Sequence, residues 1–430
     1  MMQDWFLDAK LGIFIHYGIY AVRSVSESWS FFNGTISYDA YMQQLDGFTA
    51  SKLNMSDWVD LIRRSGARYA VLTAKHHDGV ALWDTAVSDL SVVKRTPAGR
   101  DIIREYASAL QGSGIRTGLY FSLIDWSEKL YPTIYAEGSV PGDYIHDKRF
   151  SSPVDGQERY DLWERFLEFN RSQITELMRN YGTVDLLWFD GDWERSARQW
   201  NMGGFRDFLH RLNPRVVLNS RLQGYGDYQT PEQGIPVVAP EGPWEFCTTL
   251  NGSWGYNVHD EAYKSPAQVI RMFADCISMG GNMLLGIGPR EDGTFDERVH
   301  HVLTELGGWI RTNAEAVYGT RAGVDGRHFA GGSTLSRDRR VLYLFLYDIP
   351  REAVCLKGLQ VPVRTVTILE SGRTVDHHCT GGASWNDIPG IVWFSVGASD
   401  AGAYVTTLKV ELAEPLRLYE GTGEVIAQNA

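Results

Sequence analysis

Cysteine and long apolar runs are scarce in this sequence. Its 430 residues include four cysteines, which lie far apart as Cys247, Cys276, Cys355 and Cys379. Without a close pair, they indicate neither a zinc ribbon nor a disulfide scaffold, and a reducing compartment is expected. No apolar run reaches the roughly 18 residues that a membrane-spanning helix needs. The sequence therefore argues against a disulfide-dense domain and against a membrane partner.

Positive charge is also in short supply, with 41 Lys and Arg against 53 Asp and Glu, a net charge of -12. This balance argues against a nucleic-acid partner and favours a neutral ligand. The first residues lack a secretory signal, so a cytoplasmic location is expected for the chain as given, and a periplasmic or secreted one if a signal was removed. Homo-oligomer formation is left open. The one excess is 14 tryptophans, whose ring faces stack on the C–H faces of sugars.

The first 320 residues alternate apolar runs with amphipathic helical segments, a βα pattern. The predicted strands are 11–17, 69–74, 116–123, 185–190, 216–221, 246–250 and 283–287. Most are continuously apolar, as in a parallel sheet that is covered on both faces. We therefore predict an α/β fold for residues 1–320, a (β/α)8-like barrel that is irregular because its eighth strand is not obvious. A doubly wound open sheet is the alternative.

Helix ends support this pattern. Ser265 and Pro266 supply an N-cap and a first-turn proline, and Gly280 stops that helix. Ser56 is expected to begin another helix in the same way. The connection from Asp125 to Gln157 is longer than most loops in compact domains, which indicates a functional segment or disorder.

After residue 320 the pattern changes to strands alone, at 341–347, 366–369, 391–396 and 403–412. This predicts a C-terminal antiparallel β-sandwich over 321–430. The sequence His377-His378-Cys379 lies in this part, in a polar stretch that resembles a turn, and is interpreted as surface.

Active sites of such barrels lie at the carboxyl ends of the strands. The polar and aromatic residues found at or just after these ends are His16, Tyr17, Lys75, His76, His77, Asp78, Tyr120, Asp125, Trp126, Trp188, Asp190, Asp192 and Arg221. Histidines, carboxylates, an arginine and tryptophans therefore converge on one rim, as in a pocket for a polyhydroxylated ligand.

Asp190 is the strongest candidate for chemistry because it follows the apolar run 186–189. The alternative is that it caps the next helix, although Asp192 could do that. Cleavage of a glycosidic bond with retention needs a second carboxyl group about 5 Å from the nucleophile. The candidates are Glu232, Glu241 and Glu245.

A metal site is not expected, since the pair His76-His77 has no third ligand at a standard spacing. No dinucleotide fingerprint in a βαβ context, Walker loop or nucleophile elbow is present, so no cofactor is predicted. Two other classes are kept as alternatives. One is a metal-dependent hydrolase with His16, His76 and His77 as ligands, and the other is a non-catalytic sugar-binding protein.

Five segments carry a resemblance to a known family: Gly12-Ile13-Phe14-Ile15-His16-Tyr17-Gly18, Ala74-Lys75-His76-His77-Asp78-Gly79, Leu187-Trp188-Phe189-Asp190, Trp244-Glu245 with Gly255-Tyr256-Asn257, and Gly280-Gly281-Asn282-Met283-Leu284-Leu285. In order and spacing they resemble the α-L-fucosidases of glycoside hydrolase family 29. The resemblance implies a retaining exo-α-L-fucosidase that acts on a fucosylated oligosaccharide or glycoconjugate by double displacement.

The resemblance also implies roles for individual residues. Asp190 would be the nucleophile. Glu232, in Thr230-Pro231-Glu232 and 42 residues after Asp190, would be the acid/base, with Glu245 as the fallback. The implied sugar contacts are His16, Trp29, His76, His77, Trp188 and Arg221, with Tyr120 or Phe121 at a further aromatic position.

One departure from the family concerns the sugar. Relatives commonly have Glu-Trp in the first long loop, whereas this chain has Ser28-Trp29, with Glu27 shifted by one position. L-Galactose differs from L-fucose only by a hydroxyl on C6, so an exo-glycosidase that prefers α-L-galactose is the alternative within the same mechanism.

Overall fold

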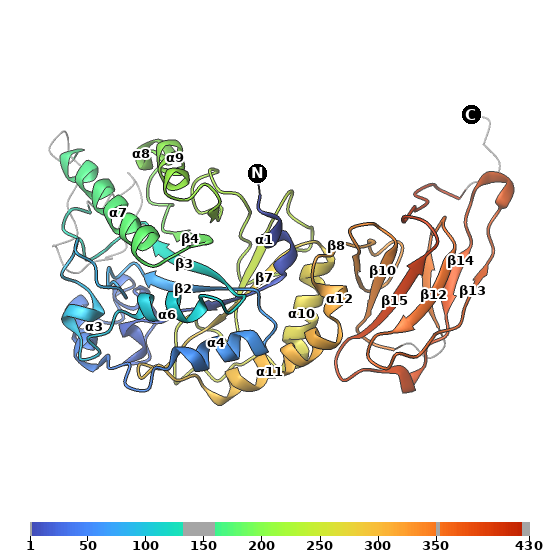
Figure 1. The fold of residues 1–430 in the computed structure, drawn as a ribbon, viewed down its shortest axis with the longest axis horizontal. Coiled ribbons are helices and arrows are strands. Elements are labelled where there is room, and N and C mark those ends of the chain that lie inside the picture. Colours follow the sequence, from blue (N-terminus) through green and yellow to red (C-terminus); the bar gives the residue numbers. More distant parts are fainter. Residues whose placement is uncertain (1, 132–159, 350–352, 424–430) are drawn as a thin grey trace.

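The computed structural model describes residues 2–131, 160–349 and 353–423. Its first part contains one curled parallel sheet (Figure 1). The strands are β1 (Leu11–Ile15), β2 (Tyr69–Lys75), β3 (Arg116–Ser122), β4 (Leu186–Asp190), β5 (Val217–Leu218), β6 (Glu245–Thr249) and β7 (Asn282–Ile287). Their order is β5-β4-β3-β2-β1-β7-β6, and every neighbouring pair is parallel. The predicted (β/α)8-like architecture is confirmed, with seven strands at the predicted positions.

The missing eighth strand is replaced by an irregular extended segment, residues 227–233. Isolated parallel bridges join Tyr228 to Asn219 beyond β5, and Glu232 to Cys247 in β6. The Cys247 N–H donates to the Pro231 carbonyl at 3.0 Å, but Pro231 has no N–H with which to continue a ladder. The irregularity predicted from the sequence thus has a local cause, and the segment that produces it carries Glu232.

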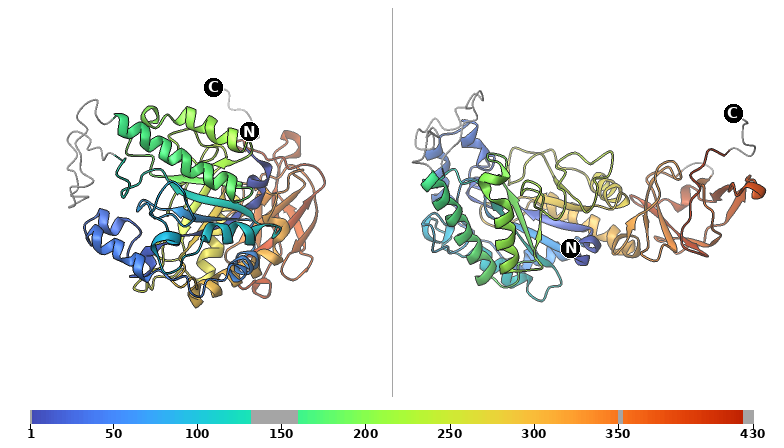
Figure 2. Two further views of the ribbon diagram at one scale, coloured as in Figure 1. Left: turned by 60° about the vertical axis from the view of Figure 1, so that its left-hand side comes forward. Right: turned by 90° about the horizontal axis from the view of Figure 1, so that it is seen from above.

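The helices surround the sheet in the views of Figure 2. They are α1 (Asp4–Ala9), α2 (Trp29–Phe32), α3 (Tyr38–Met42), α4 (Met55–Arg64), α5 (Val92–Arg95), α6 (Ile102–Leu110), α7 (Tyr160–Asn180), α8 (Ala197–Trp200), α9 (Met202–Leu212), α10 (Pro266–Ser278), α11 (Glu297–Thr312) and α12 (Ala314–Val317). Helix α10 has the predicted cap, with the Ser265 side chain accepting from the Gln268 N–H. The prediction for Ser56 is wrong, because Asn54 is the N-cap and accepts from the Ser56 N–H.

Of the long connection 125–157, only residues 125–131 belong to the described part of the chain. Among the described residues, no helix combines the length and the apolar character that crossing a membrane requires.

Apolar side chains fill both faces of the parallel sheet. Phe14, Tyr120, Trp188 and Leu284 belong to a cluster inside the curl. The intervening residues of the same strands, such as Ile13, pack outward in the larger core that the helices cover. This double burial explains why the strand sequences are continuously apolar.

The C-terminal part consists of two antiparallel sheets, which confirms the predicted sandwich. The first is β12 (Val363–Ile368), β15 (Thr406–Leu412), β10 (Val341–Leu346), β9 (Gly332–Leu335) and β8 (Arg321–Ala322), in that order. The second is β11 (Val354–Lys357), β14 (Ile391–Phe394) and β13 (His377–Thr380). The sequence missed β8, β9, β11 and β13, which are only two to four residues long. The His377-His378-Cys379 sequence was expected in a turn but begins the edge strand β13. The domain boundary at residue 320, between the barrel and the sandwich, stays a prediction.

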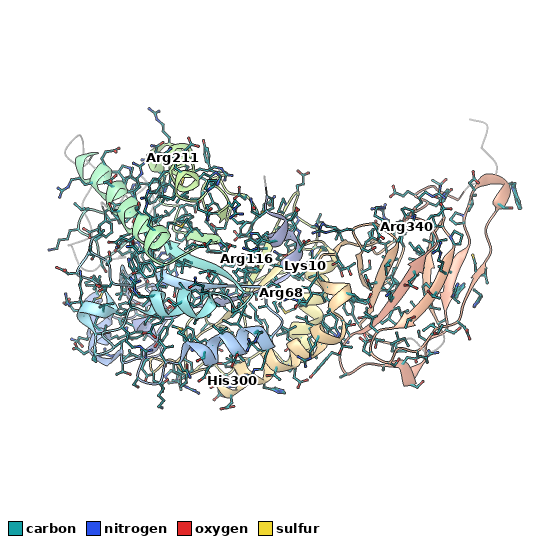
Figure 3. All side chains as sticks on the ribbon, viewed as in Figure 1. Lys10, Arg68, Arg116, Arg211, His300 and Arg340 are labelled. Carbon is teal, nitrogen blue, oxygen red and sulfur yellow. The ribbon has the colours of Figure 1, made fainter. Side chains whose placement is uncertain are left out.

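The sandwich lies against helices α10, α11 and α12 of the barrel (Figure 1). Residues at or just before the starts of β1, β2 and β3, namely Lys10, Arg68 and Arg116, lie toward the sandwich (Figure 3). The carboxyl ends of these strands therefore point to the opposite end of the molecule. Asp8 links the two parts through ion pairs with Arg321, at 2.9 Å, and with Arg337.

Trp309 on α11 anchors this contact. Its indole N–H donates to the Val405 carbonyl at 2.8 Å, and its ring lies 5.9 Å from that of Phe345 on β10. We expect Trp309→Ala to lower the free energy of unfolding by about 3–5 kcal/mol, measured by urea denaturation. Trp309→Phe, which keeps a packed ring and loses the hydrogen bond, should cost about 1 kcal/mol. Equal stability of Trp309→Ala and the parent chain would contradict this interpretation of the contact.

Candidate active site

Asp190 ends β4 inside a ring of donors. The Tyr120 hydroxyl donates to its Oδ2 and the Arg221 Nη1 to its Oδ1, both at 3.0 Å. Asn219 fixes the strand end from the side of the short β5, because its side chain bonds both the N–H and the carbonyl of Phe189 at 2.8 Å. Burial raises the pKa of Asp190, and Arg221 and Tyr120 partly offset that rise. Asp190 caps no helix, since the next helix, α8, is capped by Ser196.

His77 leaves one nitrogen open toward Asp190. The Ser122 hydroxyl donates to the Ile124 carbonyl, so its oxygen accepts the Nδ1 proton of His77 at 2.6 Å. Nε2 of the neutral ring then carries no proton. It is buried without a hydrogen-bond partner in the described structure and lies 3.6 Å from Asp190 Oδ2. Burial, aided by the charge of Arg221, lowers the pKa of His77 to about 3. Two acceptors therefore face one another without a hydrogen between them.

His16 and His76 complete a neutral histidine wall. Burial lowers the pKa of both well below the ordinary value. The His76 Nδ1 lies 2.7 Å from the Ser28 hydroxyl, whereas the His16 Nδ1 is buried without a hydrogen-bond partner among the described residues. Within the described ranges, no three His, Cys, Asp or Glu side chains form a metal-binding group. Uncharged imidazoles with open nitrogens suit the hydroxyls of a neutral ligand.

Arg221 joins Asp190 to Glu232. Its Nη1 bonds Asp190 while its Nη2 bonds the Glu232 carboxylate. The opposing carboxylates raise the pKa of Arg221 above its ordinary value, although burial alone would lower it. The guanidinium also lies over the Trp188 ring, 5.2 Å from its centroid. One planar fork therefore brings the two predicted catalytic carboxylates together.

The other glutamates are placed differently. Glu245 begins β6, at the amino-terminal end of the strands, and is completely buried. It accepts hydrogen bonds from Tyr69 at 2.5 Å, Trp188 at 3.0 Å and Tyr228 at 3.3 Å. Trp188 lies two positions before Asp190 on β4, and its ring points inward. Along the direction of the strands, this ring therefore lies between Glu245 and Asp190. The structure thus separates the fallback Glu245 from the nucleophile candidate, and Glu241 is exposed to solvent.

Aromatic rings line the rest of the rim. Tyr120, rather than Phe121, points inward and stacks on Trp188 at 5.7 Å. Trp29 lies edge-on to His77 at 5.6 Å and to Trp126 at 5.3 Å. Sequence reasoning assigned no role to Trp254, which packs against His16 at 5.0 Å. Trp254 could have been identified from its position in the loop after β6, directly before the Gly255-Tyr256-Asn257 sequence.

The departure at Ser28 has a clear structural outcome. Ser28 bonds His76, while the neighbouring Glu27 is buried and accepts from the backbone N–H of Gly255. Glu27 thereby secures the loop that carries Trp254. Neither Ser28 nor Glu27 therefore provides a carboxylate that is open to a ligand in the pocket.

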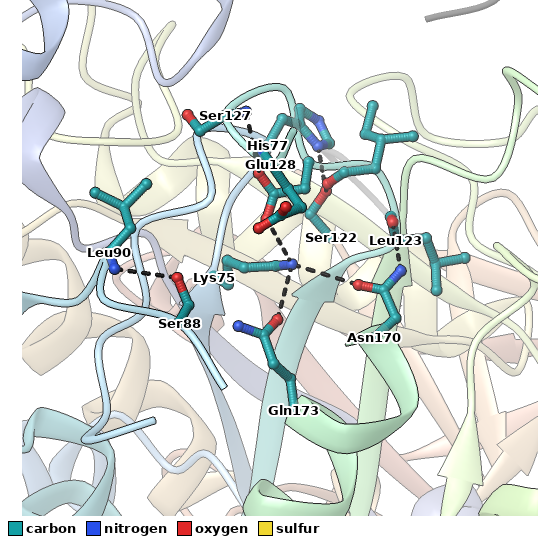
Figure 4. A network of polar contacts seen from close by, with 12 residues as sticks. Lys75, His77, Ser88, Leu90, Ser122, Leu123, Ser127, Glu128, Asn170 and Gln173 are labelled. Atoms are coloured by element: carbon teal, nitrogen blue, oxygen red, sulfur yellow. Dashed lines mark hydrogen bonds and ion pairs between the residues drawn. The ribbon is translucent and has the colours of Figure 1, made fainter. Parts of the chain in front are cut away.

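Lys75 supports the site from below (Figure 4). Its ammonium group is completely buried and lies 3.0 Å from Asp125 Oδ2 and 3.0 Å from Gln173 Oε1 on α7. Asp125 approaches so closely that a Cβ on Gly79 would lie 2.3 Å from its Oδ1, and Gly79 also has a φ of +75°. Only glycine fits there. The ion pair thus ties the end of β2, with its histidines, to the loop that holds Trp126.

A pair of carboxylates at the carboxyl end of a barrel, beside neutral histidines and aromatic rings, fits a retaining glycoside hydrolase, whose chemistry uses two carboxyl groups. The sequence model of the α-L-fucosidase family matches residues 1–315. The chain belongs to this family, glycoside hydrolase family 29. The predicted activity, that of a retaining α-L-fucosidase, is thereby confirmed.

Individual relatives agree with this assignment. The tissue α-L-fucosidase of Rattus norvegicus is 30% identical over 347 residues, 74% of this chain and 70% of that protein. The structure of α-L-fucosidase isoenzyme 1 from Paenibacillus thiaminolyticus has a TM-score of 0.84 and 32% identity, and the match covers 95% of this chain and 98% of that one. The enzyme from Bacteroides thetaiotaomicron, solved as a trapped covalent intermediate, has a TM-score of 0.83 and 25% identity over 95% of each chain.

The Lys75–Asp125 pair should be required for both stability and turnover. We expect Lys75→Met to lower the free energy of unfolding by about 3–5 kcal/mol, because it leaves a buried carboxylate unpaired. The ratio kcat/KM should fall at least tenfold as the His76 and Trp126 loops shift. Adding Asp125→Asn should recover part of the lost stability. A double variant as unstable as the sum of the single variants would contradict the pairing.

Glu245 should make stability depend on pH. Burial raises its pKa from 4.5 to about 7. The contribution of Glu245 to the free energy of unfolding is thus fully present below about pH 4.5. It is lost as the pH rises through 7, a change on the order of 3 kcal/mol. Glu245→Gln, a neutral isostere, should lack this term, so its stability relative to the parent should rise between pH 4.5 and 8. Denaturation curves across that range measure the difference, and a difference that does not vary with pH would contradict the shift.

Proposed function

We propose that Asp190 is the nucleophile and Glu232 the general acid/base in the release of terminal α-L-fucosyl residues from fucosylated glycans. The observation that carries the proposal is the Arg221 fork, which contacts both carboxylates at the mouth of the histidine-lined pocket. Retaining glycosidases need two carboxyl groups about 5 Å apart. The shared guanidinium supports the pairing of Asp190 with Glu232, whereas Glu245 is buried at the amino-terminal end of the strands.

In the first step, for which Glu232 must first have taken up a proton, an Asp190 oxygen attacks the anomeric carbon while Glu232 gives that proton to the leaving oxygen. The bond to the aglycone breaks and an ester to Asp190 forms. In the second step, Glu232 takes a proton from water, and the resulting hydroxide oxygen replaces Asp190 at the same carbon. The Glu232 side chain is 37% exposed, so water can reach it for this step.

The surrounding groups have separate tasks in this scheme. Tyr120 and Arg221 donate to Asp190 and so favour the carboxylate that attacks. We assign the open Nε2 of His77 and the open Nδ1 of His16 to hydroxyls of the sugar. Trp29 and Trp188 would hold the faces of the ring, with His76 held in place by Ser28. The comparisons favour none of the alternatives, whether L-galactose, a metal-dependent hydrolase or a non-catalytic sugar-binding protein.

Replacing the nucleophile tests the first assignment. Asp190→Ala should lower kcat for an aryl α-L-fucoside by roughly 10³-fold or more, since no group remains to form the covalent intermediate. Asp192→Asn is the matched control, because Asp192 lies two residues away and accepts from the Gln223 N–H. It should keep most of the activity. Equal losses in the two variants would move the nucleophile away from Asp190.

The acid/base assignment has its own signature. Glu232→Ala should lose about 10²–10⁴-fold on substrates with poor leaving groups, but far less on an aryl fucoside whose leaving group needs no proton. Azide should restore turnover by replacing water in the second step. Glu241→Ala, which removes an exposed glutamate nearby, should show neither effect. A Glu232→Ala enzyme whose rate does not depend on the pKa of the leaving group would contradict the role.

A further inference from the structure

A second cleft lies at the open edge of the sandwich, remote from the active site. It has a volume of about 960 Å³. One wall is the edge strand β13 with the loop that follows it, and the other is the segment 359–363 with Arg417. Figure 1 places β13 and β14 at the end of the sandwich farthest from the barrel. Pockets of roughly 300–1,000 Å³ are typical of ligand sites, so the cleft can accommodate a short oligosaccharide.

Trp385 stands at the tip of the loop between β13 and β14 and lines this cleft. The residue is 75% exposed, and its side chain has neither a ring contact nor a hydrogen bond with the described residues. The loop beneath it is closed by two hydrogen bonds between the backbones of Ala383 and Ile388, at 2.8 and 3.2 Å. An uncovered indole on this closed loop presents a flat apolar surface to the cleft.

The remaining lining combines an apolar floor with polar walls. Val361 and Val392, both buried, belong to the sandwich core and form the floor. Gln360, His377 and Arg417 supply donors and acceptors on the walls. The Arg417 guanidinium is largely free, since its side chain is 64% exposed and its ion-pair contact is a 3.4 Å bond to Glu414. An aromatic face beside neutral and cationic hydrogen-bonding groups matches a sugar ring, with its apolar C–H face and its rim of hydroxyls.

We propose that this cleft is an accessory glycan-binding site in which Trp385 stacks on a sugar ring of the substrate chain. The proposal rests on the proposed function only for the class of ligand. Because the two sites lie at opposite ends of the molecule, a small substrate cannot reach both. An extended or multivalent glycan can, and its second contact then raises the effective concentration of the enzyme at the substrate.

Affinity electrophoresis of the full chain in gels containing gastric mucin, a fucosylated glycoprotein, tests the binding. The Asp190→Ala background prevents cleavage. Adding Trp385→Ala should raise the apparent dissociation constant at least threefold. The matched control adds Trp393→Ala, which removes an indole from the neighbouring β14. Trp393 lies outside the cleft and donates to the Thr380 hydroxyl, so its removal should leave retardation unchanged. Equal retardation with and without Trp385, or the same loss in both variants, would overturn the proposal.

Hydrolysis by the otherwise unchanged enzyme separates this proposal from the proposed function. Trp385→Ala should keep the parent kcat/KM on an aryl α-L-fucoside and lose at least threefold in fucose release from mucin. Trp385→Phe, which keeps an aromatic face, should recover most of that loss. Unchanged release from mucin by Trp385→Ala would overturn the accessory site without touching the catalytic assignment. A parent enzyme inactive on aryl fucoside would instead count against the proposed function.

Discussion

The catalytic end of the molecule depends on one partly buried cation, Arg221, placed between two carboxylates. Asp190 lies in a wall of apolar strands, where a charge is costly, and Glu232 brings a second negative charge close to it. The guanidinium satisfies both through its two terminal nitrogens and can do so because its fork is planar and permanently charged. The three residues come from β4, from the turn after β5 and from the segment 227–233, which are consecutive positions around the barrel.

Neutral histidines are the second consequence of this burial. Desolvation keeps His16, His76 and His77 uncharged, and the charge of Arg221 adds to this effect at His77. An uncharged imidazole accepts at one nitrogen and donates at the other. It therefore suits the hydroxyls of a ligand better than a positively charged imidazole, which can only donate. Lys75 adds a charge at the base of the same loops, but Asp125 neutralises it at 3.0 Å. The pocket is therefore polar but carries little net positive charge. The charge of Arg221 is opposed by Asp190 and Glu232, and that of Lys75 by Asp125.

Much of this could be predicted from the sequence, because buried parallel strands and helix caps leave strong local signals. The apolar run before Asp190 and the Ser265-Pro266 cap predicted elements that the structure contains. The closing segment could not be predicted, since residues 227–233 pair only through isolated bridges and contain Pro231. Short strands such as β11 and β13 were not predicted for a similar reason, because they are defined by their pairing with neighbouring strands and not by their composition. The positions of Glu245 and Lys75 depend on contacts distant in sequence, with Tyr69 and Asp125, which no local pattern reveals.

The two parts of the chain place their polar sites at opposite ends, with the contact around Trp309 between them. For the catalytic end we propose above all that a covalent bond to the sugar forms at Asp190. Incubation with a 2-deoxy-2-fluoro-α-L-fucosyl fluoride, followed by peptide mass spectrometry, tests it most directly. We predict one added fluorofucosyl group on the peptide that contains Asp190, with activity lost in proportion to labelling. A label on Glu232 or on any other residue, or inactivation with no label at all, would contradict the account.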